Sequence, residues 1–264
     1  CTKCKILKLF KKCDAALKLG DSVLEVVETY KYLGIEFGRG LHPGSRPAPF
    51  ADYLDRISTK AAARCMVVNY LGARRDGLRP ESGIRLYKML ARPILDYGSQ
   101  TLGYTKKQIK KLEQLQLRAL KRVLGLRINT KNETVRLVTG VEPLHARFAF
   151  LKLKHLYRIQ QKPKNSLVKV VFDKIIRVEE SRPGFVTECR EHCKNYGIAF
   201  ARVVPEVAEQ PLPEFAAELK ADVYRTAFRR DLERVQDSNQ AFILASLFPP
   251  DTSYFTYKPL DIAT

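Results

Sequence analysis

The sequence predicts a mainly α-helical protein with a small antiparallel β element at its N-terminus, that is, an α+β chain. Three observations predict it. Near the N-terminus, β-branched and aromatic residues are enriched in short segments, a strand pattern. A stretch rich in Gly and Pro follows at residues 38–49, and beyond it apolar residues recur with helical spacing. Of the 264 residues, 45% are hydrophobic and no apolar run reaches 18 residues, so we expect a packed core and no membrane span.

Three short segments near the N-terminus are expected to be strands, at residues 6–10, 23–27 and 30–37. A turn is expected at residues 19–22, where Gly, Asp and Ser cluster. Residues 30–37 alternate in the period of two that is typical of a half-buried strand.

Helical periodicity begins at residue 50. Residues 50–71 place Tyr53, Ile57 and Cys65 on one face and end at Gly72. A second helix over residues 81–91 should end near Pro93, because proline disfavours a helical residue before it. Residues 166–178 fit either a strand or a buried helix. Further helices are expected at residues 132–139, 145–161, 183–196, 213–235 and 239–248.

The strongest helical pattern covers residues 105–124, with Thr105 as N-cap and Gly125 as the C-terminal stop. Its apolar residues fall on one side of the helix, and Glu113 is its only acid. The other side is cationic, and the candidate nucleic-acid-binding residues lie there: Lys106, Lys107, Lys110, Lys111, Arg118, Lys121 and Arg122.

This helix lies in the most basic part of a basic chain. The formal net charge is +19, and residues 101–164 carry 16 Lys and Arg against 3 Asp and Glu. Residues 201–264 reverse the balance, with 7 basic and 10 acidic residues. A basic segment before an acidic tail is typical of a surface that meets a polyanion, most commonly nucleic acid. The alternatives are a merely solvated helix face and, for the tail, either folding back on the basic patch or ordinary packing.

These patterns divide the chain into four segments: a strand region at residues 1–40, a linker at 41–49, a helical domain at 50–125, and a helical C-terminal region with an acidic tail at 126–264. The chain begins with Cys1 rather than Met, and we expect it to be part of a longer protein. No Gly-rich nucleotide-binding loop and no nucleophile motif occurs, so no catalytic residue is assigned.

Six unevenly spaced cysteines in a chain of this size indicate a reducing, intracellular compartment, either nucleus or cytoplasm. Cys1 and Cys4 form a CxxC pair, while Cys189, His192 and Cys193 lie close together in sequence. A zinc site needs four ligands at workable spacing, so unrelated thiols are the stronger interpretation and no metal site is assigned.

Three stretches carry a resemblance to a known family. Residues 26–37 (VVETYKYLGIEF) resemble the aromatic-Lys-Tyr-Leu-Gly-Ile strand that follows the palm in reverse transcriptases of non-LTR (LINE-like) retrotransposons. Residues 86–99 (LYKMLARPILDYGS) and 112–125 (LEQLQLRALKRVLG) are similar to helical segments that follow this strand, in the same order. The resemblance covers about residues 1–160.

The resemblance implies roles for these segments. Tyr32, Leu33 and Gly34 would belong to the primer grip, the hairpin that holds the primer end. The alternative interpretation of Tyr32 is a packed aromatic residue of a strand. Residues 1–40 would end the palm, and residues 50–125 would form the helical thumb that packs on the template–primer duplex. The implied partners are RNA, DNA and the palm and fingers of the same polyprotein, and no membrane.

The palm of this family holds two metal ions with Asp residues, including an Asp-Asp pair. No Asp-Asp pair occurs in this sequence, so the palm and its Mg²⁺ are expected upstream, and this segment should not polymerise DNA alone. One alternative is a degenerate or domesticated, non-enzymatic helical module that binds nucleic acid. Another is a protein-interaction scaffold.

Overall fold

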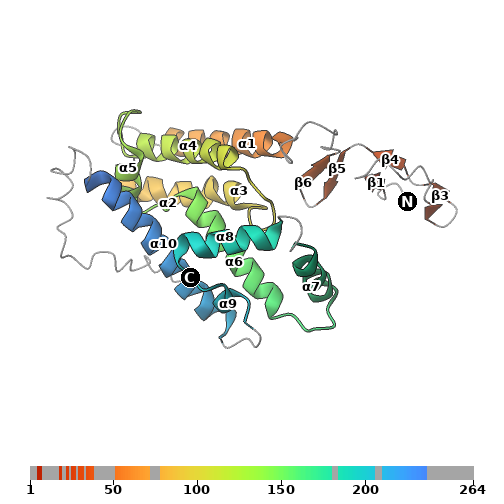
Figure 1. Cartoon of the computed structure of the whole chain (residues 1–264). Helices are drawn as coiled ribbons and strands as arrows, with labels where there is room; N and C mark the ends of the chain where they lie inside the picture. The colour runs from red at the N-terminus through yellow and green to blue at the C-terminus, as the bar shows by residue number, and fades with distance from the viewer. Residues whose placement is uncertain are drawn as a thin grey trace.

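The computed structural model describes residues 5–7, 18–19, 22–23, 25–27, 29–32, 34–38, 51–71, 78–179, 184–205 and 210–236. It is mainly α-helical, as the sequence predicts (Figure 1). The helices are α1 (Ala51–Tyr70), α2 (Pro80–Leu90), α3 (Arg92–Asp96), α4 (Lys106–Val123), α5 (Asn132–Thr139), α6 (Leu144–Gln160), α7 (Leu167–Glu179), α8 (Phe185–Tyr196), α9 (Phe200–Val203) and α10 (Leu212–Gln236). Among the described helices, none combines the length and the apolar character that a membrane crossing requires.

The N-terminal strands form short pairs. They are β1 (Lys5–Leu7) parallel to β4 (Glu25–Val27), β2 (Lys18–Leu19) antiparallel to β3 (Ser22–Val23), and β5 (Thr29–Tyr32) antiparallel to β6 (Ile35–Gly38). The strand expected over residues 30–37 is therefore two strands. Gly34 has φ of +81°, a conformation that glycine adopts at little cost, and the chain reverses there so that Tyr32 pairs with Ile35.

Most predicted helices agree closely with the structure. Residues 132–139 form α5 as expected, and the ambiguous residues 166–178 are helical in α7. Phe172 of α7 is buried and Ile176 packs against the same core, which explains the choice of helix over strand. The helix expected over residues 81–91 ends at Leu90 as α2, and Pro93 lies in the first turn of the short α3. The helix expected at residues 239–248 lies outside the described residues.

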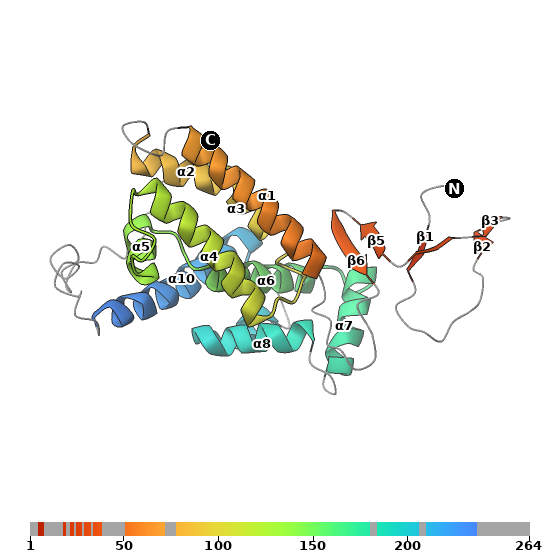
Figure 2. The same cartoon turned by 90° about the horizontal axis from the view of Figure 1, so that it is seen from above.

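Two helices, α1 and α4, lie side by side along one edge of the molecule (Figures 1 and 2). Beneath them, α6 packs against α4, α8 and α10. One apolar cluster joins α1, α3, α4 and α6, and it contains Tyr53, Leu95, Leu112 and Phe148. A second and larger cluster joins α6 to α8 and α10. The helix α10 thus packs as an ordinary core helix through its apolar stripe, which includes Phe215, Leu219, Val223 and Ala227.

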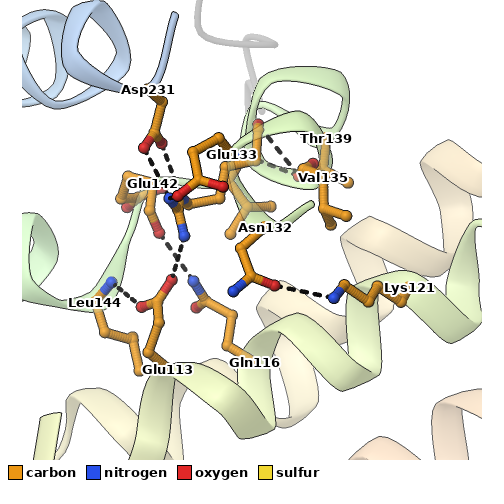
Figure 3. Close-up of polar contacts among 12 residues, drawn as sticks. Glu113, Gln116, Lys121, Asn132, Glu133, Val135, Thr139, Glu142, Leu144 and Asp231 are labelled. Carbon is orange, nitrogen blue, oxygen red and sulfur yellow. Dashed lines mark hydrogen bonds and ion pairs between the residues drawn. The ribbon is translucent and has the colours of Figure 1, made fainter. Parts of the chain in front are cut away.

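A buried arginine connects four of these elements. Arg136 of α5 donates from Nε and Nη2 to the two oxygens of Asp231 on α10, at 2.6 and 2.7 Å. Its Nη1 donates to Glu113 of α4 at 3.1 Å, and the other oxygen of Glu113 accepts from the backbone N–H of Leu144, which opens α6, at 2.6 Å. Figure 3 shows Asp231 and Glu113 converging from α10 and α4. Such pairs are stable only when both partners remain, because a single buried charge is costly.

The first prediction concerns this network. Replacing Asp231 with Asn preserves the side-chain shape but removes the charge that Arg136 faces, so we expect the free energy of unfolding to fall by about 3 kcal/mol. Urea denaturation at pH 7 measures it. Asp222→Asn is the matched control on the same helix, since Asp222 pairs with Arg202 at 2.7 Å but is partly exposed, and it should cost less than about 1 kcal/mol. Equal losses in the two variants would contradict the role given to Arg136.

Candidate nucleic-acid interface

Residues next to the two ends of α4 determine where this helix begins and ends. The Thr105 hydroxyl accepts from the Gln108 N–H at 3.3 Å, and the Gln108 side chain accepts from the Thr105 N–H at 2.8 Å, a capping box. After the helix, Gly125 takes φ of +66°, which ends it. The predicted start and stop of this helix are confirmed.

Six of the seven predicted cationic residues are exposed on α4. Four of them form what we call the α4 stripe, with spacings of four, seven and four residues that place them on one face: Lys107, Lys111, Arg118 and Arg122. At 1.5 Å per residue, the α4 stripe extends over about 22 Å. Lys106 and Lys110 add positive charge beside it.

Lys121 differs from the other six residues. Its side chain is buried, with 7% of the residue exposed, and its ammonium donates to the Ile128 carbonyl at 2.8 Å and to Asn132 Oδ1 at 2.9 Å. Burial lowers its pKa below the ordinary value. The expectation that Lys121 lies on the exposed cationic side is therefore wrong, because residues after α4 fold over this part of the helix and use its charge internally (Figure 3).

The only acid of α4 is also turned inward. Glu113 is held between Arg136 and the Leu144 N–H, and burial raises its pKa above the ordinary value. Since Glu113 faces the core, the exposed side of α4 carries no carboxylate from its own helix. Surface helices usually place acids among their bases in i, i+4 pairs. The exposed face of α4 thus keeps a single sign of charge.

One carboxylate from another helix reaches this surface. Asp55 of α1 accepts a hydrogen bond from Lys111 at 2.5 Å, and both side chains are well exposed. Sequence reasoning missed this contact, because Asp55 and Lys111 are 56 positions apart. The pair fixes the start of α1 beside the start of α4, and it offsets part of the charge of Lys111.

The residues expected in the primer grip lie at the same end of α1. Tyr32 is the last residue of β5, Gly34 forms the turn, and Leu33 lies outside the described residues. The Gly34 carbonyl accepts from Arg56 Nη2 at 3.3 Å. A Cβ on Gly34 would lie 3.6 Å from the Tyr97 hydroxyl, and Ile35 packs on the cluster around Tyr53. The hairpin therefore touches the first turns of α1, one residue from Asp55.

Cys189 and Cys193 are one helical turn apart on α8, and both are buried in the apolar core as reduced thiols. His192 lies beside them in sequence but approaches Glu188 instead, at 4.0 Å. Within the part of the chain that the structure describes, no three His, Cys, Asp or Glu side chains are placed to hold a metal ion. The CxxC pair at Cys1 and Cys4 lies outside it.

The evidence for function comes from the residues of this chain, because comparison with known proteins identifies no relative. No family model, no curated protein and no solved structure matches this chain.

The second prediction separates Lys121 from its neighbours on α4. Lys121→Met keeps the length of the side chain but removes two charge-assisted hydrogen bonds, so we expect a loss of about 2 kcal/mol in the free energy of unfolding. Arg118→Met removes an exposed charge from the same helix and should change it by no more than about 0.5 kcal/mol. Urea denaturation of both variants checks this, and similar stabilities would show that Lys121 is not used in the core.

The third prediction uses His192, whose pKa is lowered to about 4 by burial and then by the nearby ammonium of Lys152. The unfolded chain protonates this imidazole near its ordinary pKa of 6.5, whereas the folded chain does so only near pH 4. The unfolded state therefore binds more protons between these values, and the free energy of unfolding falls as the pH is lowered from 6.5 to 4.

His192→Gln removes this contribution, and its stability should decline less steeply than that of the wild type over the same pH range. Denaturation curves measured at half-unit pH steps test it. Parallel declines in the two proteins would show that His192 has no lowered pKa in the folded state.

Proposed function

We propose that this chain is the template–primer-binding segment of a non-LTR retrotransposon reverse transcriptase, and that α4 contacts the sugar–phosphate backbone. The observation that carries the proposal is the α4 stripe, with Lys106 and Lys110 beside it, on a helix whose only acid is turned into the core. Lys and Arg at this spacing bind phosphates without reading sequence, and they release counterions when they do so.

The family resemblance gives this surface its context. Residues 50–125 would be a helical, thumb-like bundle, and the β5–β6 turn would be the primer grip. The contact between Gly34 and Arg56 supports a primer grip beside the thumb-like bundle. It brings the β5–β6 turn to the end of α1 where Asp55 and Lys111 meet. A nucleic-acid strand on α4 would thus continue towards the hairpin.

The mechanism of this segment is positioning rather than chemistry. Mg²⁺ and the catalytic carboxylates would be supplied by a palm upstream in the same polyprotein, and we do not expect the segment to polymerise DNA alone. It would act inside the cell, in the nucleus or the cytoplasm, where its thiols stay reduced. The buried, reduced thiols of Cys65, Cys189 and Cys193 are consistent with that setting.

A second candidate function is a degenerate or domesticated module that binds nucleic acid or a protein without copying. The exposed apolar side chains of α7 favour a protein partner, since contiguous apolar surface usually marks an interaction site. Leu167 is 76% exposed, and Val168, Val171 and Ile175 are also exposed on this helix.

The fourth prediction tests the proposed function. We would titrate a labelled RNA–DNA hybrid with the chain over a salt series, beside a variant in which Lys107, Lys110, Arg118 and Arg122 are changed to Gln. The logarithm of the wild-type affinity should fall linearly with the logarithm of the salt concentration. Loss of four phosphate contacts should reduce the magnitude of that slope by about 3 and weaken binding at every salt concentration.

The control variant removes the same number of charges elsewhere, from the exposed residues Lys162, Lys164, Lys174 and Lys194. It has the same net charge as the α4 variant, so it should keep most of the wild-type affinity and slope. Equal losses of affinity in the two variants would show that binding depends only on the net charge of the chain and not on α4. Association that persists at high salt, without binding of the hybrid, would favour the protein-interaction module.

A further inference from the structure

One exposed face of α1 carries no cation. Four residues with spacings of four, seven and four lie along this face, and we call them the α1 stripe: Asp55, Thr59, Met66 and Tyr70. Asp55 bonds Lys111, so the α1 stripe runs next to the α4 stripe from its start. The two helices run side by side (Figure 2). The basic residues of α1, by contrast, fall outside the stripe at Arg56, Lys60 and Arg64.

The last residue of the α4 stripe, Arg122, also lies near α1, at the level of Cys65. Burial raises the pKa of the Cys65 thiol to about 11. The nearby positive charge of Arg122 opposes this rise. Arg122 ends the α4 stripe, and Met66 and Tyr70 follow Cys65 on α1. Each stripe covers 16 residues, or 15 steps from first to last, so each extends about 22 Å. A cationic row and a largely uncharged row thus lie in parallel.

The uncharged row ends in side chains that are unusually open to solvent. Tyr70 is 92% exposed and Met66 is 64% exposed. Tyrosine usually buries part of its ring, because the aromatic surface gains free energy when it leaves water. An aromatic ring beside a cationic track is the combination with which proteins bind single strands, the cations holding phosphates and the ring stacking on a base.

We propose that α1 and α4 bind an unpaired strand together, with its phosphates on the α4 stripe and a base stacked on Tyr70. This inference rests on the proposed function of α4 and narrows its substrate to nucleic acid with a single-stranded portion. A base inside a duplex is already stacked on both faces and cannot lie flat on Tyr70. A single strand therefore gains a contact at Tyr70 that a blunt duplex does not.

The test compares Tyr70→Leu, which keeps an apolar side chain without the ring, with Tyr70→Phe, which keeps the ring. The probe is a short labelled single-stranded DNA, used intact and with abasic sites in place of its bases, and a blunt duplex of equal length. We expect Tyr70→Leu to weaken binding of the intact strand about fivefold or more, while Tyr70→Phe binds like the wild type. Because the ring meets no phosphate, the salt slope should not change.

The abasic strand supplies the decisive comparison. It keeps the phosphates but offers no base, so wild type and Tyr70→Leu should bind it equally, and all three proteins should bind the blunt duplex equally. If Tyr70→Leu binds the intact strand as well as the wild type does, or if its defect persists on the abasic strand, no base stacks on Tyr70.

That outcome leaves the proposed function intact, provided that the α4 variant still loses affinity and salt slope. A wild-type chain that binds none of the probes would overturn both proposals. The apolar end of the α1 stripe would then be assigned to a protein partner.

Discussion

The interaction on which the rest of this structure depends is the buried contact of Arg136 with Asp231 and Glu113. It joins α5 to α10 and α4, and through the Leu144 N–H it extends to the start of α6. It also determines the surface of α4. Because Arg136 holds Glu113 in the core, the single carboxylate of α4 itself is withdrawn from the exposed cations of that helix. A contact that stabilises the helical body therefore also produces the cationic face.

The surface that results has two sides with different chemistry. The α4 stripe presents cations, and the α1 stripe presents Thr59, Met66 and the open ring of Tyr70. Asp55 links the two helices at one end, where the Gly34 turn also meets Arg56. The hairpin, the start of α1 and the start of α4 thus converge within a few side chains. This convergence supports an assignment of the hairpin and the helices to one binding track.

Local signals in the sequence were sufficient for the helices. Thr105, Gln108 and Gly125 act on backbone groups within a few positions, so the bounds of α4 follow from its own residues. The inward placement of Lys121 depends on Ile128 and Asn132, and that of Glu113 depends on Arg136, so a helical wheel of α4 could not predict either one. The β5–β6 hairpin was predicted as one strand for another reason. Its two strands continue the same period of two, and only the positive φ of Gly34 separates them.

Lysine footprinting tests the central claim most directly. An amine-reactive reagent would be applied to the chain with and without a bound RNA–DNA hybrid carrying a single-stranded overhang, and modified lysines would be identified by mass spectrometry. The account predicts that the hybrid protects Lys106, Lys107 and Lys110, that Lys121 reacts poorly in both states because it is buried, and that Lys174 and Lys194 react equally in both. Protection of Lys174 and Lys194 without protection of α4 would contradict the assignment of this helix as the phosphate-binding surface.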